Sequence, residues 1–416
     1  MLAETTLVVA TTVALYALVS RRLDRFWVTG PMVFVAAGLV LGPQSLGVLT
    51  LDASHEPVRL LAELTLALVL FADASRIDLG ALRAEAGLPV RLLAVAMPLG
   101  VGLGAGAAKL LLPELGWLEA ATLGALLAPT DAALGQAVLA SPRVPQRIRQ
   151  TLNVESGLND GIALPAVAIF AGLAGADERG ADAWLTFVLA QLGLGPLVGV
   201  ATGWLGGRLL TRAHAAGTVS PSMERVAGLS LALTAWALAE AIGGNGFIAA
   251  FVAGASIGAV ARARIHHVHT FLEAEGELMM VLVFLMFGSS LLWPAVREAD
   301  LRVWIVVALA LTVVRMLPVA LSLLGSGARA PTVVFLGWFG PRGLATVLFG
   351  LIVIADSTVP HAQLLERVAF CAAGASVLVH GLSALPGARV YGRWARTHDV
   401  AGVHPEVTEH PLRRRG

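Results

Sequence analysis

The chain has 416 residues, of which 57% are hydrophobic and only 14% are charged, and its mean hydropathy is +0.78. A water-soluble domain carries about 25% charged residues, so this composition excludes an ordinary soluble protein. The 29 basic residues nearly balance the 28 acidic ones, and nucleic acid is therefore not an expected partner. The single cysteine, Cys371, excludes an intrachain disulfide framework and a CxxC site.

Apolar segments long enough to cross a bilayer recur along the whole chain. A membrane-spanning helix needs roughly 20 mainly apolar residues, and segments of this kind predict an all-α polytopic membrane protein with about thirteen spans. The first span lacks the basic leader and cleavage site of a secretory signal and is expected to remain in the mature protein. In chain order the predicted spans are residues 4–20, 27–42, 57–75, 89–112, 117–140, 151–174, 183–210, 223–242, 245–261, 271–292, 300–324, 331–356 and 362–387.

Basic residues separate the connections between these spans into two sets. Alternate connections, beginning with residues 21–26, hold most of the arginines, and the intervening connections hold few basic residues. Basic connections remain in the cytoplasm. The pattern therefore predicts an odd number of spans, an outside amino terminus, and a short basic cytoplasmic tail at residues 389–416.

Ionisable side chains at mid-membrane depth are costly and are candidates for function. In the span 151–174, Asp160 lies about 15 Å from the membrane face at 1.5 Å per residue. The spacing Glu155 to Asn159 and Ser156 to Asp160 places all four side chains on one helical face. The functional interpretation is an ion site, and the alternative is an interhelical hydrogen-bond cluster without transport function.

Two spans are predicted to be broken near the membrane centre. Pro129 interrupts the fifth span next to Thr130 and Asp131, and broken helices that line a cavity are how transporters coordinate cations. Residues 338–343 interrupt the twelfth span at a second proline, next to Arg342. A buried guanidinium needs a partner, and Glu155 is the expected one; the alternative is that backbone carbonyls bind Arg342. Pro129 taken alone could also be a simple kink.

The broken fifth and twelfth spans are seven spans apart, and an odd offset reverses the direction of a helix across the membrane. This arrangement predicts inverted repeats. The expected organisation is a first repeat at 1–175, a connecting span at 176–212, a second repeat at 213–388 and the tail at 389–416.

Other patterns are expected to be structural. Glycines at 195, 199, 203 and 207 recur every four residues, which predicts close helix packing. Residues 254–258 match the G-x-S-x-G nucleophile elbow, but they lie in an apolar helix without a preceding strand, so an enzyme is not expected. Further charges within predicted spans are expected to be structural partners, namely Glu240, Glu273, Glu277 and Arg315.

Taken together, these motifs resemble those of the monovalent cation:proton antiporters of the NhaP/NHE type, over the chain up to about residue 385. The resemblance depends on residues 130–131, 155–161, 240–246 and 340–343. It implies a thirteen-span homodimer, in which a mobile core carries the ion past a fixed dimerisation domain by alternating access.

The resemblance also implies roles for individual residues. Asp160 would carry both the cation and the proton, and Asn159 stands where electrogenic relatives have a second aspartate. Asp131 would take part in cation and proton exchange with Asp160 and Asn159, while Glu155 and Arg342 would form a structural ion pair. The Na+ ligands or close supports would be Asp160, Asp131, Thr130, Ser156 and Asp73. Asp73 replaces a longer glutamate of archaeal relatives, and Ala132 replaces a proline.

The expected function is exchange of Na+ or Li+ for H+ across the plasma membrane, serving pH and sodium homeostasis without a cofactor. Because Asn159 does not titrate, one proton per cation and electroneutral transport are expected. The partners would be the cation, the proton, the lipid bilayer and a second copy of the chain. The alternatives are K+/H+ exchange by the same fold, a cation channel, or an ion-coupled solute symporter.

Overall fold

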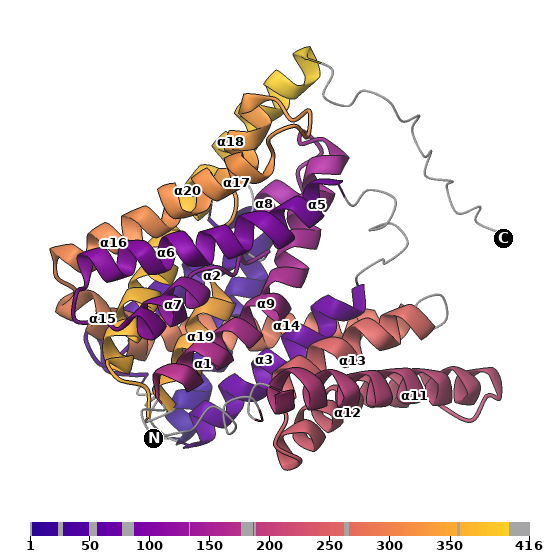
Figure 1. Ribbon diagram of the computed structural model, residues 1–416. Helices are drawn as coiled ribbons and strands as arrows, with labels where there is room; N and C mark the ends of the chain where they lie inside the picture. The colour runs from indigo at the N-terminus through magenta and orange to yellow at the C-terminus, as the bar shows by residue number, and fades with distance from the viewer. Residues whose placement is uncertain are drawn as a thin grey trace.

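The computed structural model describes residues 2–23, 28–49, 56–76, 87–132, 134–175, 186, 189–261, 266–355 and 358–398 (Figure 1). Within these residues every regular element is a helix. The α-helices and the π-helical segments (η) are α1 (Leu2–Leu23), α2 (Gly30–Leu41), α3 (Glu56–Arg76), α5 (Gly87–Arg91), η1 (Leu92–Ala96), α6 (Met97–Leu111), α7 (Trp117–Leu126), α8 (Gln136–Leu139), α9 (Gln146–Ala174), η2 (Ala190–Leu194), α11 (Gly195–Ala215), α12 (Pro221–Ala241), α13 (Gly246–Ala261), α14 (His266–Met286), η3 (Phe287–Leu291), α15 (Leu292–Glu298), α16 (Leu301–Leu311), α17 (Val313–Ser322), α18 (Ala330–Trp338), α19 (Leu344–Ala355) and α20 (Ala362–Thr397).

Every predicted span contains helix, which confirms the prediction of an all-α polytopic membrane protein. Six continuous helical stretches in the described residues are long and apolar enough to cross a membrane without help from another helix. Two of the remaining spans are divided by an unwound segment, one between α7 and α8 and one between α18 and α19. The predicted repeat boundaries remain a prediction. Residues 176–185, at the expected start of the connecting span, and residues 399–416, which make up most of the expected tail, lie outside the described residues.

The two predicted breaks are present and they meet. α7 ends at Leu126 and α8 begins at Gln136, while α18 ends at Trp338 and α19 begins at Leu344. A proline in each gap cannot donate a backbone hydrogen bond to the helix. The Asp131 N–H donates to the Pro341 carbonyl at 2.8 Å, so the two unwound segments contact each other directly.

The glycine stripe of α11 packs against α13, as its spacing predicted. A Cβ atom added to Gly203 would lie 2.3 Å from the carbonyl oxygen of Ala253, which leaves no room for any side chain. Figure 1 shows α11, α12 and α13 side by side, and contacts join all three pairs of these helices. Small residues therefore bring these backbones together where apolar lipid gives little driving force for association.

α13 packs equally closely on α3, which carries Asp73. Cβ atoms added to Gly254 and Gly258 would lie 2.2 Å and 2.4 Å from the carbonyl oxygens of Phe71 and Ser75. The glycines of the G-x-S-x-G sequence thus serve helix packing. Because the contacts fall on either side of Asp73, α13 determines how deeply that carboxylate is placed.

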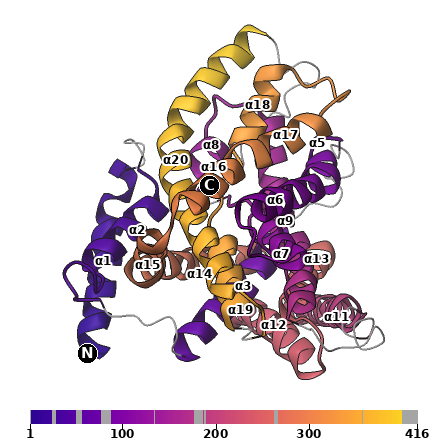
Figure 2. The ribbon, with the colours of Figure 1, turned by 60° about the vertical axis from the view of Figure 1, so that its left-hand side comes forward.

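The last helix, α20, is long and continuous. It has 36 residues and extends ten residues beyond the predicted end of its span at residue 387. It contacts α15, α16 and α19, and Figure 2 shows it along one side of the molecule. α20 therefore offers the second unwound segment an uninterrupted helix to pack against.

Candidate functional site

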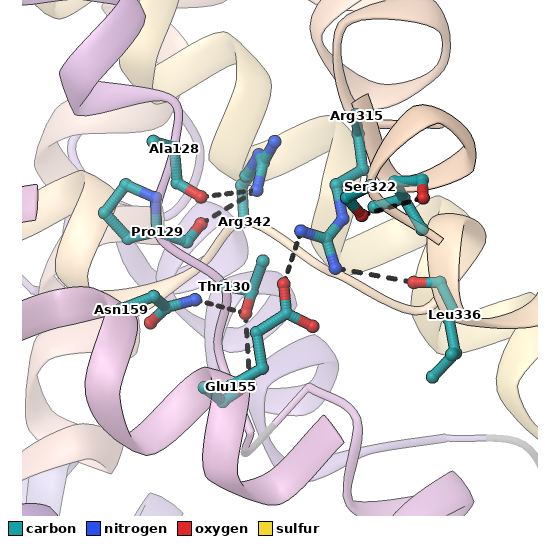
Figure 3. Close-up of polar contacts among 11 residues, drawn as sticks. Ala128, Pro129, Thr130, Glu155, Asn159, Arg315, Ser322, Leu336 and Arg342 are labelled. Carbon is teal, nitrogen blue, oxygen red and sulfur yellow. Dashed lines mark hydrogen bonds and ion pairs between the residues drawn. The ribbon is translucent and has the colours of Figure 1, made fainter. Parts of the chain in front are cut away.

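Polar side chains of α9 meet the first unwound segment at the centre of the molecule. Thr130, Ser156 and Asn159 are buried, with 2%, 9% and 2% of their surface exposed. Asn159 Nδ2 donates to Thr130 Oγ1 at 2.5 Å (Figure 3), and Thr130 Oγ1 lies 3.1 Å from Ser156 Oγ. The structure therefore brings these three predicted residues together.

Two oxygens beside this cluster have no hydrogen-bond partner among the described residues. They are Asn159 Oδ1 and Asp160 Oδ1, and both atoms are buried. Buried polar atoms in folded proteins are nearly always hydrogen-bonded. Two adjacent side chains with unsatisfied oxygen acceptors are therefore suited to receive a cation, and the carboxylate is suited to receive a proton.

The other two predicted carboxylates, Asp73 and Asp131, lie on different parts of the chain from Asp160: Asp73 on α3 and Asp131 between α7 and α8. Asp73, on α3, is partly exposed. No three His, Cys, Asp or Glu side chains in the described part of the chain converge on one point, so the three aspartates do not surround a common centre in this conformation. Asp160 directly follows Asn159 in α9.

Asp131 joins the two breaks. Its carboxylate oxygen Oδ2 accepts the Leu344 N–H at 2.8 Å and so caps the start of α19. A carboxylate at this position satisfies an amide that has no partner within the helix and interacts favourably with the helix dipole. A Cβ atom on Gly343 would lie 2.1 Å from the same Oδ2 atom. The glycine of the second break is thus required by the close approach of Asp131.

The predicted ion pair between Glu155 and Arg342 is wrong. Arg342 is 3% exposed, and its Nη1 donates to the carbonyl oxygens of Ala128 at 2.9 Å and Pro129 at 3.1 Å. These carbonyls follow the end of α7, where the helix dipole is negative. Arg342 therefore binds backbone carbonyls, which was the alternative left open by the sequence.

Arg315 of α17 is the partner of Glu155. Its Nη1 lies 2.5 Å from Glu155 Oε1, and both side chains are buried (Figure 3). Nη2 of Arg315 also donates to the Leu336 carbonyl at 3.4 Å. A Cβ atom on Gly340 would lie 2.4 Å from Nε of Arg315, so this glycine leaves room for the guanidinium. The sequence placed two arginines at membrane depth and did not distinguish which of them reaches Glu155.

Two of the other charges in the spans have described side chains, one at a helix start and one at the surface. Glu240 Oε1 accepts the Gly246 N–H at 2.8 Å, at the start of α13, which is the structural role expected for it. The side chain of Glu277 is exposed, and that of Glu273 lies outside the described residues.

Sequence reasoning missed two residues of α20 that contact the second break. The Arg342 N–H donates to Ser376 Oγ at 2.7 Å, and Ser376 Oγ lies 3.0 Å from His380 Nδ1. A serine and a histidine four residues apart in an apolar span were the available signal. That spacing puts both side chains on one helical face, but it does not reveal what the face contacts.

The chain matches a known protein family and is similar in sequence to individual antiporters. The family described as "Sodium/hydrogen exchanger, transmembrane" matches residues 7–388. The K(+)/H(+) antiporter NhaP2 of Shewanella oneidensis is 27% identical over 389 residues, covering 91% of this chain and 65% of that protein. The Na(+)/H(+) antiporter 2 of Zygosaccharomyces rouxii is 27% identical over 259 residues, covering 57% and 31%. The chain therefore spans less than two thirds of the length of these relatives.

Among solved structures, the chain is similar to the sodium proton antiporter MjNhaP1 of Methanocaldococcus jannaschii at pH 8. The TM-score is 0.78 and the sequence identity is 19%, and the match covers 94% of this chain and 99% of the other. At this identity the similarity shows a shared fold, which agrees with the predicted NhaP-like architecture.

Proposed function

The chain belongs to the sodium/hydrogen exchanger family, as its motifs predicted, and from this premise we propose that it exchanges Na+ or Li+ for H+ as a secondary active antiporter. The observation that carries the proposal is that Asn159 and Asp160, consecutive residues of α9, each have a buried Oδ1 atom without a hydrogen-bond partner among the described residues. Carboxylate and amide oxygens are hard ligands that suit Na+ and Li+. Asp160 is the proposed carrier of the cation and of the proton.

Thr130 and Ser156 are the proposed neutral members of the site, since their hydroxyls lie within 3.1 Å of each other beside Asn159. Asp131 and Asp73 are proposed to add negative charge near the ion, which supports cation binding without requiring that all three carboxylates touch it. Oδ2 of Asp131 also accepts the capping bond from Leu344, so the same carboxylate links the proposed site to the start of α19.

Competition at Asp160 explains exchange. A cation and a proton each neutralise the carboxylate, so binding of one on a given side of the membrane releases the other. An empty ionised carboxylate is costly inside the membrane, and the core therefore moves between its inward-open and outward-open states only when loaded. Exchange then needs no nucleotide hydrolysis and no covalent intermediate.

The proposed stoichiometry is one proton for one cation. Asn159 does not titrate, and Glu155 is engaged in the buried pair with Arg315 at 2.5 Å. Asp160 is then the residue that exchanges its proton, and transport is electroneutral. Arg315 supplies the positive charge beside Glu155 that was expected from Arg342, so the proposed stoichiometry is the same with either arginine.

K+/H+ exchange is the second candidate, because the similar Shewanella protein is named a K(+)/H(+) antiporter. We also propose a homodimer in the plasma membrane, with the amino terminus outside and the carboxyl terminus in the cytoplasm. The distribution of arginines between alternate connections supports this orientation.

The test uses purified protein in proteoliposomes that hold a proton gradient, with Na+, Li+ and K+ added separately. Cation-induced loss of the gradient, insensitive to an imposed membrane voltage, is the expected result. Voltage-dependent exchange would refute one-for-one stoichiometry, and a response to K+ alone would select the second candidate. Cation current without proton movement would indicate a channel, and dependence on an organic solute would indicate a symporter.

A further inference from the structure

Ser376 and His380 lie on α20, outside the broken helices, and their exposures are 0% and 1%. A chain of hydrogen bonds connects them to the second break: the Arg342 N–H donates to Ser376 Oγ at 2.7 Å, and this oxygen lies 3.0 Å from His380 Nδ1. The backbone amide of Arg342 is thus attached to a continuous helix through the Ser376 hydroxyl group.

The imidazole fixes the orientation of that hydroxyl. His380 Nδ1 also lies 3.2 Å from the Ser376 carbonyl oxygen. If Nδ1 carries the proton, the ring donates to Ser376; if Nε2 carries it, the hydroxyl donates to the ring. Either tautomer therefore leaves a lone pair of Ser376 Oγ directed at the Arg342 amide.

The imidazole also packs against an aromatic side chain at the end of α18. The ring lies against Trp338 with centroids 5.3 Å apart. Nε2 of His380 is buried and has no hydrogen-bond partner among the described residues. A buried ring nitrogen without a hydrogen-bond partner lowers the stability of the protein. A specific role for the other ring nitrogen would explain why a histidine stands here.

The amide that Ser376 holds belongs to the residue that links the two breaks. The guanidinium of Arg342 binds the carbonyls of Ala128 and Pro129, which directly precede Thr130. On either side of Arg342, the Pro341 carbonyl and the Leu344 amide bond to Asp131. A rotation of the Arg342 peptide would therefore move both the guanidinium and the groups that orient Asp131.

We propose that Ser376 and His380 are positioning residues for cation binding, which hold the Arg342 peptide so that the first break presents Thr130 and Asp131 correctly to the ion. This inference depends on the proposed function. Groups that orient the ligands of a metal typically change its affinity about 10- to 100-fold when removed. Loss of the Ser376 hydroxyl is expected to raise the KM for Na+ about tenfold and to change kcat far less.

The experiment measures initial rates of cation-driven proton release against Na+ concentration, per amount of folded protein in the proteoliposomes. Ser376→Ala and His380→Leu should both raise KM, and Ser376→Thr, which keeps the oxygen, should restore it towards the wild-type value. The matched control is Ser383→Ala, because Ser383 also lies on α20 and accepts a hydrogen bond from Trp338 Nε1 at 2.9 Å. Its KM should not change.

An unchanged KM in Ser376→Ala, or an equal rise in the Ser383→Ala control, would overturn the inference while leaving the exchange function intact. If Ser376→Ala does not fold, the KM of His380→Leu serves as the test. An unchanged KM in that variant overturns the inference. Wild-type protein that exchanges none of the three cations would instead refute the proposed function itself.

Discussion

The pairing of Glu155 with Arg315 predicts a large energetic coupling between these two residues and a small one between Glu155 and Arg342. The relevant variants are Glu155→Gln, Arg315→Met and Arg342→Met, with the double variants of Glu155 with each arginine. Each single change leaves a buried group without its partner, whereas the Glu155→Gln/Arg315→Met protein removes both members of the pair.

The size of the coupling energy between Glu155 and Arg315 depends on how deeply the pair is buried. The side chains of Glu155 and Arg315 are 3% and 7% exposed and approach to 2.5 Å, so solvent does little to screen the pair. Removing one partner of a buried ion pair costs about 3–5 kcal/mol, whereas replacing both with well-packed apolar or neutral groups costs much less. The expected coupling is therefore about 3 kcal/mol for Glu155 with Arg315.

Arg342 gives a different expectation because its guanidinium binds carbonyls rather than the carboxylate. Arg342→Met should destabilise the protein by leaving the two carbonyls unsatisfied. That cost should nonetheless add to the cost of Glu155→Gln, with a coupling below about 1 kcal/mol.

The assay is equilibrium unfolding of the purified proteins in mixed detergent micelles, followed by tryptophan fluorescence, with free energies combined in two double-mutant cycles. Wild-type protein recovered after refolding is the control for reversibility. A coupling for Glu155 with Arg342 equal to or larger than that for Glu155 with Arg315 would refute the assignment of the ion pair.

Three further predictions concern the carrier, a helix contact and a helix cap. Asp160→Asn should abolish exchange in proteoliposomes without changing the apparent melting temperature by more than a few degrees, and retained exchange would remove Asp160 from its role. Gly254→Ala should destabilise the protein by about 1–3 kcal/mol through overpacking against α3, whereas Gly106→Ala, with open space at its Cβ position, should not. Asp300 accepts the Val303 N–H at 3.0 Å, which holds the pKa of Asp300 below its ordinary value. The stabilisation by this hydrogen bond is present above about pH 4 and is lost as pH falls further. Asp300→Ala should therefore lower the melting temperature at pH 7, and the melting temperatures of the variant and the wild type should converge in acid. A difference in melting temperature that does not change with pH would contradict this.

Several features of the site were predictable because they depend on neighbours in the chain. Helical periodicity places Glu155, Ser156, Asn159 and Asp160 on one face whatever surrounds them. Pro129 breaks its own helix because it lacks an N–H, and the glycine spacing of α11 marks the face that packs most closely. Hydropathy and arginine distribution likewise predicted the spans without any knowledge of their packing.

The partners of the buried charges could not be predicted in this way. Arg315 and Arg342 are both arginines in apolar spans, and the sequence contains no measure of which one faces Glu155. The capping of α19 by Asp131 and the attachment of Arg342 to Ser376 also join residues far apart in the chain, at 131 and 344 and at 342 and 376.

The sequence by itself thus determined that this is a many-span membrane protein with broken helices and a carboxylate at their centre, because those properties follow from local composition and helix geometry. The tertiary structure alone decided which charge neutralises which, because the energy of a buried charge depends on distances of a few ångströms between helices whose relative positions no local pattern encodes.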